Sequence, residues 1–365
     1  MNLHNSFGRY FTITSHGESH GAGIGIIIDG CPSGLDIEID KIQKELNRRR
    51  PGQSGISTSR SEQDRVEIMS GILNGKSTGA PISMYIRNTN IDSSKYAQFR
   101  IKPRPSHADY PALMKYGKSV DLRGGGRFSG RNTAGFVMAG AVAKMLLELV
   151  NIKVAAYTRS VSNIKDETEY SVATITDSVE NNSVRTVNPK KAQKMEQLII
   201  NVKELHDSVG GVVTCLVEGV LPGVGEPIFN SLESSLSAAI FSIPGVRGIE
   251  FGLGFKATEI NGSRHNDPFS IKNGKIITTS NNSGGIIGGI STGMPIKFNV
   301  AIKPTASIGI VQNTVNLDSS KPEKLKIEGR HDPCIVPRAV PVVEAITAVV
   351  LVDFLIGNGM ISKTL

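Results

Sequence analysis

The pattern of hydrophobic and polar positions predicts helices and strands in mixed order along the chain. Short apolar runs bounded by turn residues indicate strands at residues 23–29, 212–220, 248–255 and 296–302. Longer stretches with helical periodicity indicate helices at residues 36–48, 135–150, 189–208, 231–243 and 339–356. Because strands and helices do not alternate with a regular beat of about 30 residues, the pattern does not favour a doubly wound parallel sheet.

Some boundaries can also be predicted. Asp36 or Asp40 can cap the start of the helix at residues 36–48, and Pro51 stops it. The segment at residues 160–189 is polar, so we expect it to be an excursion from the main fold.

Composition suggests an anionic partner. The chain has 365 residues, enough for two domains or one large one, and 39 of them are glycine. Its 41 Lys and Arg against 33 Asp and Glu give a net charge of +8. A basic nucleic-acid-binding protein is therefore one alternative, with residues 48–50 (Arg-Arg-Arg) as its basic cluster. Trp is absent and aromatic residues make up 5%, which argues against non-specific single-strand binding, because that class stacks bases on aromatic side chains.

Cysteine usage and hydrophobicity indicate a cytoplasmic protein. Cys31, Cys215 and Cys334 are odd in number and far apart, which fits neither a disulfide scaffold nor a zinc site. A reducing compartment is the simplest interpretation. The longest apolar stretch, at residues 339–356, contains Pro341 and two acidic residues, which argues against a membrane span.

Glycines cluster in predicted loops. Residues 124–126 are three consecutive glycines, and four more lie within residues 284–289. Glycine adopts positive φ and lets the backbone approach a ligand closely. Arg127 and Arg131 flank the first cluster just before a predicted helix, so this segment predicts a site for an anion or a flat cofactor, with a structural turn as the alternative.

Two short motifs allow other chemistry. His16 and His20 have the spacing of a zinc-protease helix, but the glycine and serine between them weaken a helix there, so no metal site is predicted and a loop or catalytic histidine stays open. Ser291 lies in a G-x-S-x-G motif, which a serine hydrolase needs between a strand and a helix. Here a predicted strand follows it, so a glycine-rich turn is favoured.

Three basic clusters lie in glycine- or proline-rich loops, at residues 48–52, 102–109 and 329–334. The first alone fits cations that complement a helix dipole. The other two combine arginine, histidine and aspartate. Together the clusters suggest a polyanionic small molecule bound by arginines, with histidines for proton transfer.

At these residues the chain resembles the chorismate synthase family. Residues 17–32, 126–140 and 330–344 are similar to the family's three signatures, and shorter family-like stretches lie at residues 48–52, 104–110 and 303–307. The similarity runs in the family's order from about residue 7 to residue 355. It implies one domain over residues 1–365 and an α+β fold, a β-α-β sandwich with helices between two antiparallel sheets, usually assembled as a homotetramer.

The resemblance also implies a lyase reaction at the end of the shikimate pathway. Phosphate and the C6 pro-R hydrogen leave 5-enolpyruvylshikimate 3-phosphate by anti 1,4-elimination to give chorismate. The family requires reduced FMN without net redox change. Some members reduce it with NADPH, and others depend on an external flavin reductase. Two carboxylates and a phosphate on the substrate suit arginine forks, and neither nucleic acid nor membrane is expected as a partner.

Candidate site residues follow from the same resemblance. His20 is expected near the departing phosphate, His107 beside the flavin, and Asp332 near flavin N5. The substrate arginines implied are Arg49, Arg60, Arg104, Arg131 and Arg330. The flavin contacts implied are Arg127, Phe128, Ser129, Pro244, Gly245, Gly288, Lys303, Pro304, Thr305, Ala306, Ser307 and Arg330.

Three features of the sequence bear on how far the resemblance extends. Arg49 also corresponds to a position that the family assigns to NADP, whereas Gly55 stands where many members have an arginine. Phe128 stands where a small residue is frequent. His16 falls outside the signature and has no assigned role.

Overall fold

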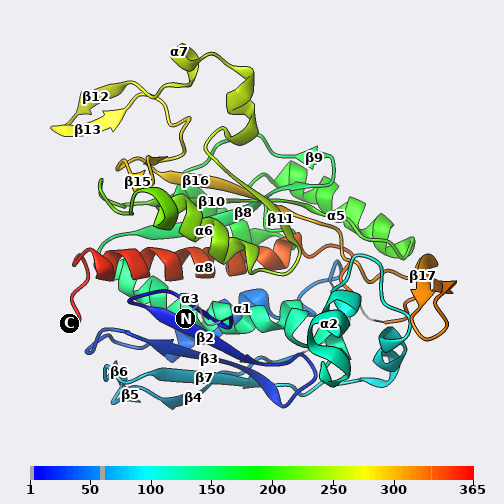
Figure 1. Ribbon diagram of the computed structural model, residues 1–365. Helices are drawn as coiled ribbons and strands as arrows, with labels where there is room; N and C mark the ends of the chain where they lie inside the picture. The colour runs from blue at the N-terminus through cyan, green and yellow to red at the C-terminus, as the bar shows by residue number, and fades with distance from the viewer. Residues whose placement is uncertain (1–3, 58–61, 330) are drawn as a thin grey trace.

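The computed structural model describes residues 4–57, 62–329 and 331–365. Two five-stranded antiparallel sheets enclose a layer of helices (Figure 1). The first sheet has the order β1 (Ser6–Phe7), β2 (Thr12–Gly17), β3 (Gly23–Asp29), β7 (Ile82–Arg87), β4 (Glu67–Ser70). The second has the order β11 (Val246–Phe251), β16 (Ile296–Ile302), β10 (Gly211–Glu218), β8 (Lys153–Val161), β9 (Ile164–Lys165). The predicted α+β class, a β-α-β sandwich, is confirmed.

The layer between the sheets is formed by α1 (Ile39–Arg49), α3 (Thr133–Leu149) and α8 (Val336–Gly357). Helix α3 contacts β3 of the first sheet, α8 contacts β8 and β10 of the second, and the two helices pack against each other. At their contact, a Cβ added to Gly140 would stand 2.3 Å from Ala345 Cβ. Glycine therefore lets the helices approach closely enough to fill the space between the sheets.

Helix α8 is apolar on every side, as expected for a helix buried all round. Among the described residues it is the one helix whose length and hydropathy would suit a membrane span, and its apolar window is entirely buried inside the fold. Pro341 lies within it and cannot donate a backbone hydrogen bond. The carbonyl of Pro337, four residues earlier, instead accepts a hydrogen bond from Arg185 Nη1 at 3.0 Å.

The remaining elements surround this sandwich. The helices are α2 (Asp109–Tyr116), α4 (Val172–Ser178), α5 (Pro189–Glu204), α6 (Leu232–Phe241) and α7 (Gly262–His265). The hairpins pair β5 (Ile72–Leu73) with β6 (Lys76–Ser77), β12 (Phe269–Lys272) with β13 (Lys275–Thr278), β14 (Ile286–Ile287) with β15 (Ile290–Ser291), and β17 (Gln312–Asn316) with β18 (Lys321–Leu325). Short 3₁₀ segments include η1 (Ser94–Arg100), η3 (Arg123–Phe128), η4 (Gly130–Asn132) and η7 (Gly254–Glu259). Residues 160–189 contain β9 and α4, whose Val172 and Ile175 are buried in the core.

Two predicted boundaries are wrong for local reasons. The strand predicted through residue 255 ends at Phe251, because Gly252 turns the chain with a φ of +57° and a Cβ there would lie 2.0 Å from Asn282 O. The helix predicted from residue 36 begins at Ile39, because Asp36 forms an antiparallel bridge with Lys76. The N-cap position is Glu38, and its side chain makes no capping hydrogen bond.

Candidate active site

A cavity of about 540 Å³ opens where loops from both halves of the sandwich meet the ends of α1 and α8. Its wall is formed by the end of α1, the loops before α2 and α3, the loops beside β11 and β16, and the first turns of α8. The structure brings most of the predicted site residues to this wall: Arg49, Arg104, His107, Arg127, Phe128, Ser129, Arg131, Pro244, Gly245, Lys303, Pro304, Thr305, Ala306, Ser307 and Asp332.

Of the four other predicted residues, two lie outside the described residues and two are not among those that line the cavity. Arg60 and Arg330 lie outside the described residues. Gly288 is exposed in the turn between β14 and β15, away from the cavity-lining residues. His20 is buried behind the wall, with its Nδ1 2.8 Å from Ser93 Oγ. Ligand contacts by His20 and Gly288 stay predictions.

The glycine loop before α3 has the backbone conformation that its sequence predicts. Gly124, Gly125 and Gly126 have φ values of +58°, +85° and +50°. A Cβ on Gly124 would stand 2.2 Å from His20 Cδ2, and a Cβ on Gly126 would stand 2.0 Å from Asp121 O. The loop thus needs glycine to pass His20, and Gly124 then forms part of the cavity wall.

His107 is held by Asp109, a carboxylate whose side chain is fully buried. Asp109 Oδ1 lies 2.8 Å from His107 Nδ1 and also accepts a hydrogen bond from Arg104 Nη2 at 2.7 Å. Arg104 Nη2 also lies 3.1 Å from the same ring nitrogen, but an ionised carboxylate can only accept a hydrogen bond, so the 2.8 Å contact with Asp109 requires the proton to be on Nδ1. The carboxylate therefore fixes the proton of His107 on Nδ1. Nε2 faces Gly125, where an added Cβ would lie 3.5 Å away.

Burial disfavours the charged form of Asp109, but the hydrogen bonds from Arg104 and His107 outweigh it. They hold the pKa of Asp109 well below its ordinary value of 3.8. Asp109 is consequently ionised across the physiological range, and it orients both the Arg104 fork and the His107 ring. Arg104 Nη1 also donates to Ser307 Oγ at 3.1 Å, which ties this group to the loop after β16.

Arg49 and Arg131 share a second buried carboxylate. Arg49 Nη1 donates to Asp64 Oδ2 at 2.9 Å, and Arg131 Nη1 donates to Asp64 Oδ1 at 2.7 Å. Arg131 Nε also donates to Asn88 Oδ1 at 2.6 Å. The two guanidinium groups at the end of α1 and before α3 are thus joined through one acidic side chain.

Asp332 forms an ion pair with Arg338 of α8, and Arg338 Nε donates to the backbone carbonyl of Arg49 at 3.2 Å. His331, the neighbour of Asp332, also lines the cavity. Burial, aided by the positive charges of Arg104 and His107, lowers the pKa of His331 to about 4, so the ring is neutral near pH 7. Its Nε2 is buried and has no hydrogen-bond partner among the described residues.

Sequence reasoning did not single out three groups as site residues: Asp64, Arg247 and Arg338. It included His331 in the cluster at residues 329–334 but gave it no individual role. His331 and Arg338 lie within the third family-like signature, which was a signal that could have indicated them. Asp64 and Arg247 lie outside the quoted stretches, and only the fold brings them to the site.

The cavity holds more positive charge than its carboxylates neutralise. Among the described residues that line it, seven are Lys or Arg and one is acidic, Asp332. Even with Asp64 and Asp109 behind the wall, cations are left in excess. Burial, and then repulsion from Arg247, lowers the pKa of Lys303, and burial lowers that of Arg127. Such desolvated cations favour an anionic ligand.

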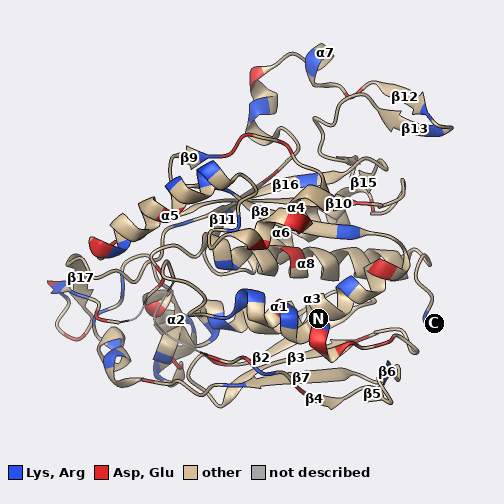
Figure 2. Cartoon of the chain, turned by 180° about the vertical axis from the view of Figure 1, so that it is seen from behind, with Lys and Arg blue, Asp and Glu red and all other residues tan. Residues whose placement is uncertain are grey.

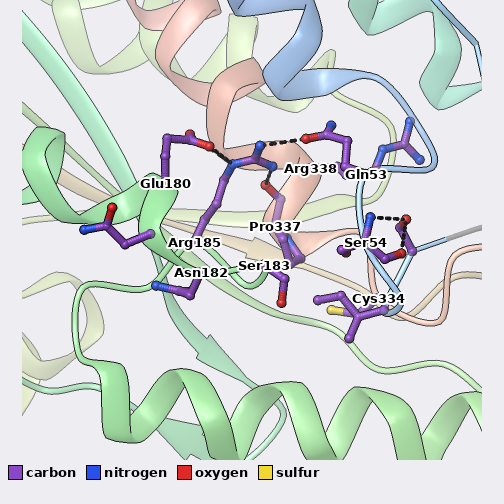
Figure 3. Close-up of a pocket in the computed structure, with 12 residues that line it drawn as sticks. Gln53, Ser54, Glu180, Asn182, Ser183, Arg185, Cys334, Pro337 and Arg338 are labelled. Carbon is purple, nitrogen blue, oxygen red and sulfur yellow. Dashed lines mark hydrogen bonds and ion pairs between the residues drawn. The ribbon is translucent and has the colours of Figure 1, made fainter.

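A second cavity of about 350 Å³ shares Arg338 with the first (Figure 3). Its buried cation, Arg185, is already satisfied: it donates to Glu180, to Gln53 Oε1 at 3.0 Å and to the Pro337 carbonyl at 3.0 Å. Gln53 lies beyond the end of α1, and its Nε2 donates to the backbone carbonyl of Arg48 in that helix at 2.8 Å. This cavity therefore has internally paired charges, whereas the larger one has charges left for a ligand.

The alternative motifs have structural explanations. His16 lies on β2 and stacks on Tyr85, whereas His20 follows the strand, so the two histidines do not share a helix face. Ser291 Oγ donates to Leu221 O at 2.6 Å and accepts from Val224 N at 2.9 Å, and no helix follows it before β16. Figure 2 shows Lys and Arg distributed over both halves of the fold and interspersed with Asp and Glu, rather than gathered in one stripe.

Comparison with known proteins agrees with this site. The profile of the chorismate synthase family matches residues 11–356. The chain belongs to the chorismate synthase family. It is 49% identical to the chorismate synthase of Dehalococcoides mccartyi, with all of both chains covered. It is also 49% identical to that of Methanococcoides burtonii, covering 98% of this chain and 97% of the relative.

A crystal structure of chorismate synthase has the same fold. It superposes with a TM-score of 0.75 at 30% identity, covering 96% of this chain and 93% of the other. The protein is accordingly an enzyme, a lyase of this family.

The family implies a flavin cofactor, and the cavity fits one. Gly124 leaves one part of the wall without a side chain, which suits a flat ring. Arg247 and Lys303 are cations on the same wall that suit a phosphate group, and no carboxylate among the described residues forms an ion pair with either. Phe128, at a position often occupied by a small residue, also belongs to this wall.

Proposed function

We propose that this protein converts 5-enolpyruvylshikimate 3-phosphate to chorismate by anti 1,4-elimination of phosphate and the C6 pro-R hydrogen. This would be the last step of the shikimate pathway. The observation that carries the proposal is the excess of desolvated cations around one cavity, because the substrate has two carboxylates and a phosphate. The family membership supports it independently.

Different residues of the cavity wall are proposed to bind the substrate and to transfer protons. Arg49, Arg104 and Arg131 bind the anionic groups of the substrate, each fork held in place by a buried aspartate. Arg60 and Arg330 are proposed for the same task. His107 holds its Nδ1 proton toward Asp109, so Nε2 is the atom that exchanges a proton at the cavity. His20 is proposed near the departing phosphate, and Asp332 is proposed near flavin N5.

Reduced FMN, when bound, supplies electron density to the breaking C–O bond, which no amino-acid side chain can do. Arg127, Ser129, Lys303 and Thr305 are among the residues proposed to hold it. A cytoplasmic location is part of this proposal. So is a source of reducing equivalents, either NADPH bound by this chain or a separate flavin reductase.

An anaerobic assay tests the proposal. With photoreduced FMN and the enolpyruvyl substrate, we expect chorismate absorbance and free phosphate to rise together in a ratio of about one to one. Oxidised FMN under the same conditions is the control and should give no product. Turnover with NADPH and FMN alone would show that the chain reduces its own flavin. Folded protein that yields neither product with photoreduced FMN would disprove the proposed function.

We also propose a homotetramer, supported by apolar side chains on the projecting β12–β13 hairpin. Phe269, Ile271 and Ile276 are 72%, 77% and 70% exposed, and the hairpin stands away from the sandwich (Figure 1). Such a group of exposed apolar side chains is typical of a protein interface.

Replacing Ile271 and Ile276 together by lysine is expected to reduce the particle mass measured by light scattering to that of a smaller assembly. The matched control is Leu205→Lys, at the end of α5, where one isolated apolar side chain is 68% exposed. An unchanged mass in the hairpin variant would place the interface elsewhere.

A further inference from the structure

Asp64 is a buried carboxylate between two cavity arginines, with its side chain completely shielded from solvent. Each of its oxygens accepts a hydrogen bond from a different guanidinium, Arg49 at 2.9 Å and Arg131 at 2.7 Å. Both arginine side chains are themselves at most 4% exposed. Asp64 therefore cannot reach a ligand itself, but it touches two groups that can.

The backbone at Asp64 is held in a conformation that suits glycine better. Its φ is +47°, in the left-handed region. Helix α1 fixes the segment from the other side, since Gln43 Nε2 donates to Asp64 O at 3.1 Å and Gln43 Oε1 accepts from Val66 N at 3.1 Å. This backbone conformation alone would favour glycine. The presence of aspartate instead indicates that its carboxylate has a role at this position.

The two arginines come from separate parts of the fold. Arg49 ends α1, and its backbone carbonyl accepts from Arg338. Arg131 lies in η4 before α3, with Asn88 holding its Nε. Asp64 is the described side chain that contacts both guanidinium groups, so it sets their separation and orientation.

We propose that Asp64 is a positioning residue that fixes Arg49 and Arg131 as one unit for an anionic group of the substrate. The inference rests on the proposed function, because it takes the enolpyruvyl phosphate substrate as the ligand. Two arginines sharing one carboxylate keep a net positive charge toward the cavity. The shared carboxylate also prevents the two cations from separating before the substrate arrives.

Substrate binding measured by calorimetry tests the proposal, using the protein with oxidised FMN so that no turnover occurs. Asp64→Asn keeps the size of the side chain but replaces one acceptor by a donor. We expect the Kd for 5-enolpyruvylshikimate 3-phosphate to rise about tenfold or more, as for loss of a hydrogen bond to a charged group. If Asp64 only neutralised charge, the variant would be more positive and would bind the anion more tightly.

A double-mutant cycle with Arg131→Gln separates positioning from a general structural role. If Asp64 acts through Arg131, the effect of Asp64→Asn on the Kd should shrink clearly in the Arg131→Gln background. The same loss in both backgrounds would overturn the proposal, and so would an unchanged or lower Kd in Asp64→Asn alone. FMN affinity, measured by fluorescence quenching, should stay within about threefold of the wild type.

Asp353→Asn is the matched control. Asp353 is a buried carboxylate whose Oδ1 accepts hydrogen bonds from the backbone N–H groups of Arg9, Tyr10 and Phe11, away from the cavity. It should lower the melting temperature without changing the Kd.

Should Asp64→Asn be insoluble, Asp64→Glu serves instead: it keeps the charge but moves the carboxylate, and an unchanged Kd would again overturn the proposal. Wild-type protein that neither binds nor converts the substrate would disprove the proposed function itself.

Discussion

Replacing His107 by alanine is expected to lower kcat at least about tenfold, and by as much as about 10⁴-fold, the range that a positioned acid or base contributes. Asp109 fixes the proton on Nδ1 through the 2.8 Å contact, so Nε2 is the ring nitrogen left to exchange a proton with a ligand in the cavity. Rapid-quench or stopped-flow measurement of chorismate formation with saturating reduced FMN would give kcat directly.

The control for this variant is His265→Ala, since His265 lies at the end of α7, outside the cavity wall. It should leave kcat unchanged. Asp109→Asn should reproduce part of the loss of His107→Ala, because the amide no longer fixes the ring or the Arg104 fork. A rise in KM with kcat intact would make His107 a binding residue instead.

The same test applies to Asp332, for which we expect a loss in kcat of at least about tenfold in Asp332→Ala. Its ion pair with Arg338 suggests a way to separate roles. Arg338→Gln would keep the carboxylate but remove this ion pair, so a smaller loss of kcat than in Asp332→Ala would assign the difference to the Asp332 carboxylate. Near-wild-type kcat in Asp332→Ala would remove its proposed role.

The pH dependence between about 5 and 8 should not come from Asp109 or His331. The pKa of Asp109 is held far below this range, and the pKa of His331 is lowered to about 4. Neither group changes charge in that interval, so any rise or fall of activity with pH there comes from other titratable groups.

Long, strongly patterned elements were predictable from the sequence. Strands β3 and β16 form at the predicted bounds, because β3 is a short apolar run closed by turn residues and β16 has apolar residues at alternate positions. The closing apolar helix forms as α8. Strands β2, β7 and β8 were not predicted, and their place in the sheets depends on pairing with distant segments, such as β8 with β10. Periodicity alone carries no information about such pairing.

The sequence indicated the cationic residues of the site, but it did not indicate the carboxylates with which they pair. Family-like motifs indicated Arg49, Arg104 and Arg131, and the structure places all three on one wall. The motifs did not indicate Asp64, which lies 67 positions from Arg131 in the chain and meets it only in the folded structure. For Arg48 the sequence suggested a local role, whereas the structure shows a contact with a distant residue. Its position predicted a helix-dipole contact, yet its guanidinium reaches Glu344, 296 positions away.

This buried network around Glu344 leads to the largest stability effect we expect. Glu344 lies in α8, 3% exposed, where its carboxylate accepts from Arg48 Nη1 at 2.6 Å and Lys144 Nζ at 2.7 Å. The backbone N–H of Ala156 in β8 donates to it at 3.0 Å. One side chain thus joins α1, α3, α8 and the second sheet.

Glu344→Gln should lower the free energy of unfolding by about 3–5 kcal/mol, the cost of leaving buried charges without their partner. Urea titration of the wild type and the variant at pH 7 measures it. The control is Glu148→Gln, because Glu148 pairs with Lys41 on the surface with its side chain 58% exposed, and such pairs contribute at most about 1 kcal/mol. A loss below about 1 kcal/mol in Glu344→Gln would mean that the network does not stabilise the sandwich.

The pH dependence gives an independent check with a definite sign. Burial would raise the pKa of Glu344, but Arg48 and Lys144 outweigh it and hold the pKa well below its ordinary value of 4.5. In the unfolded chain the carboxyl takes up a proton as the pH falls through about 4.5, while in the folded protein it stays ionised. The stabilisation is therefore complete above about pH 5 and declines below it. Because Glu344→Gln has no proton to take up, its stability should fall less steeply below pH 4.5 than that of the wild type, by about 1.4 kcal/mol per pH unit.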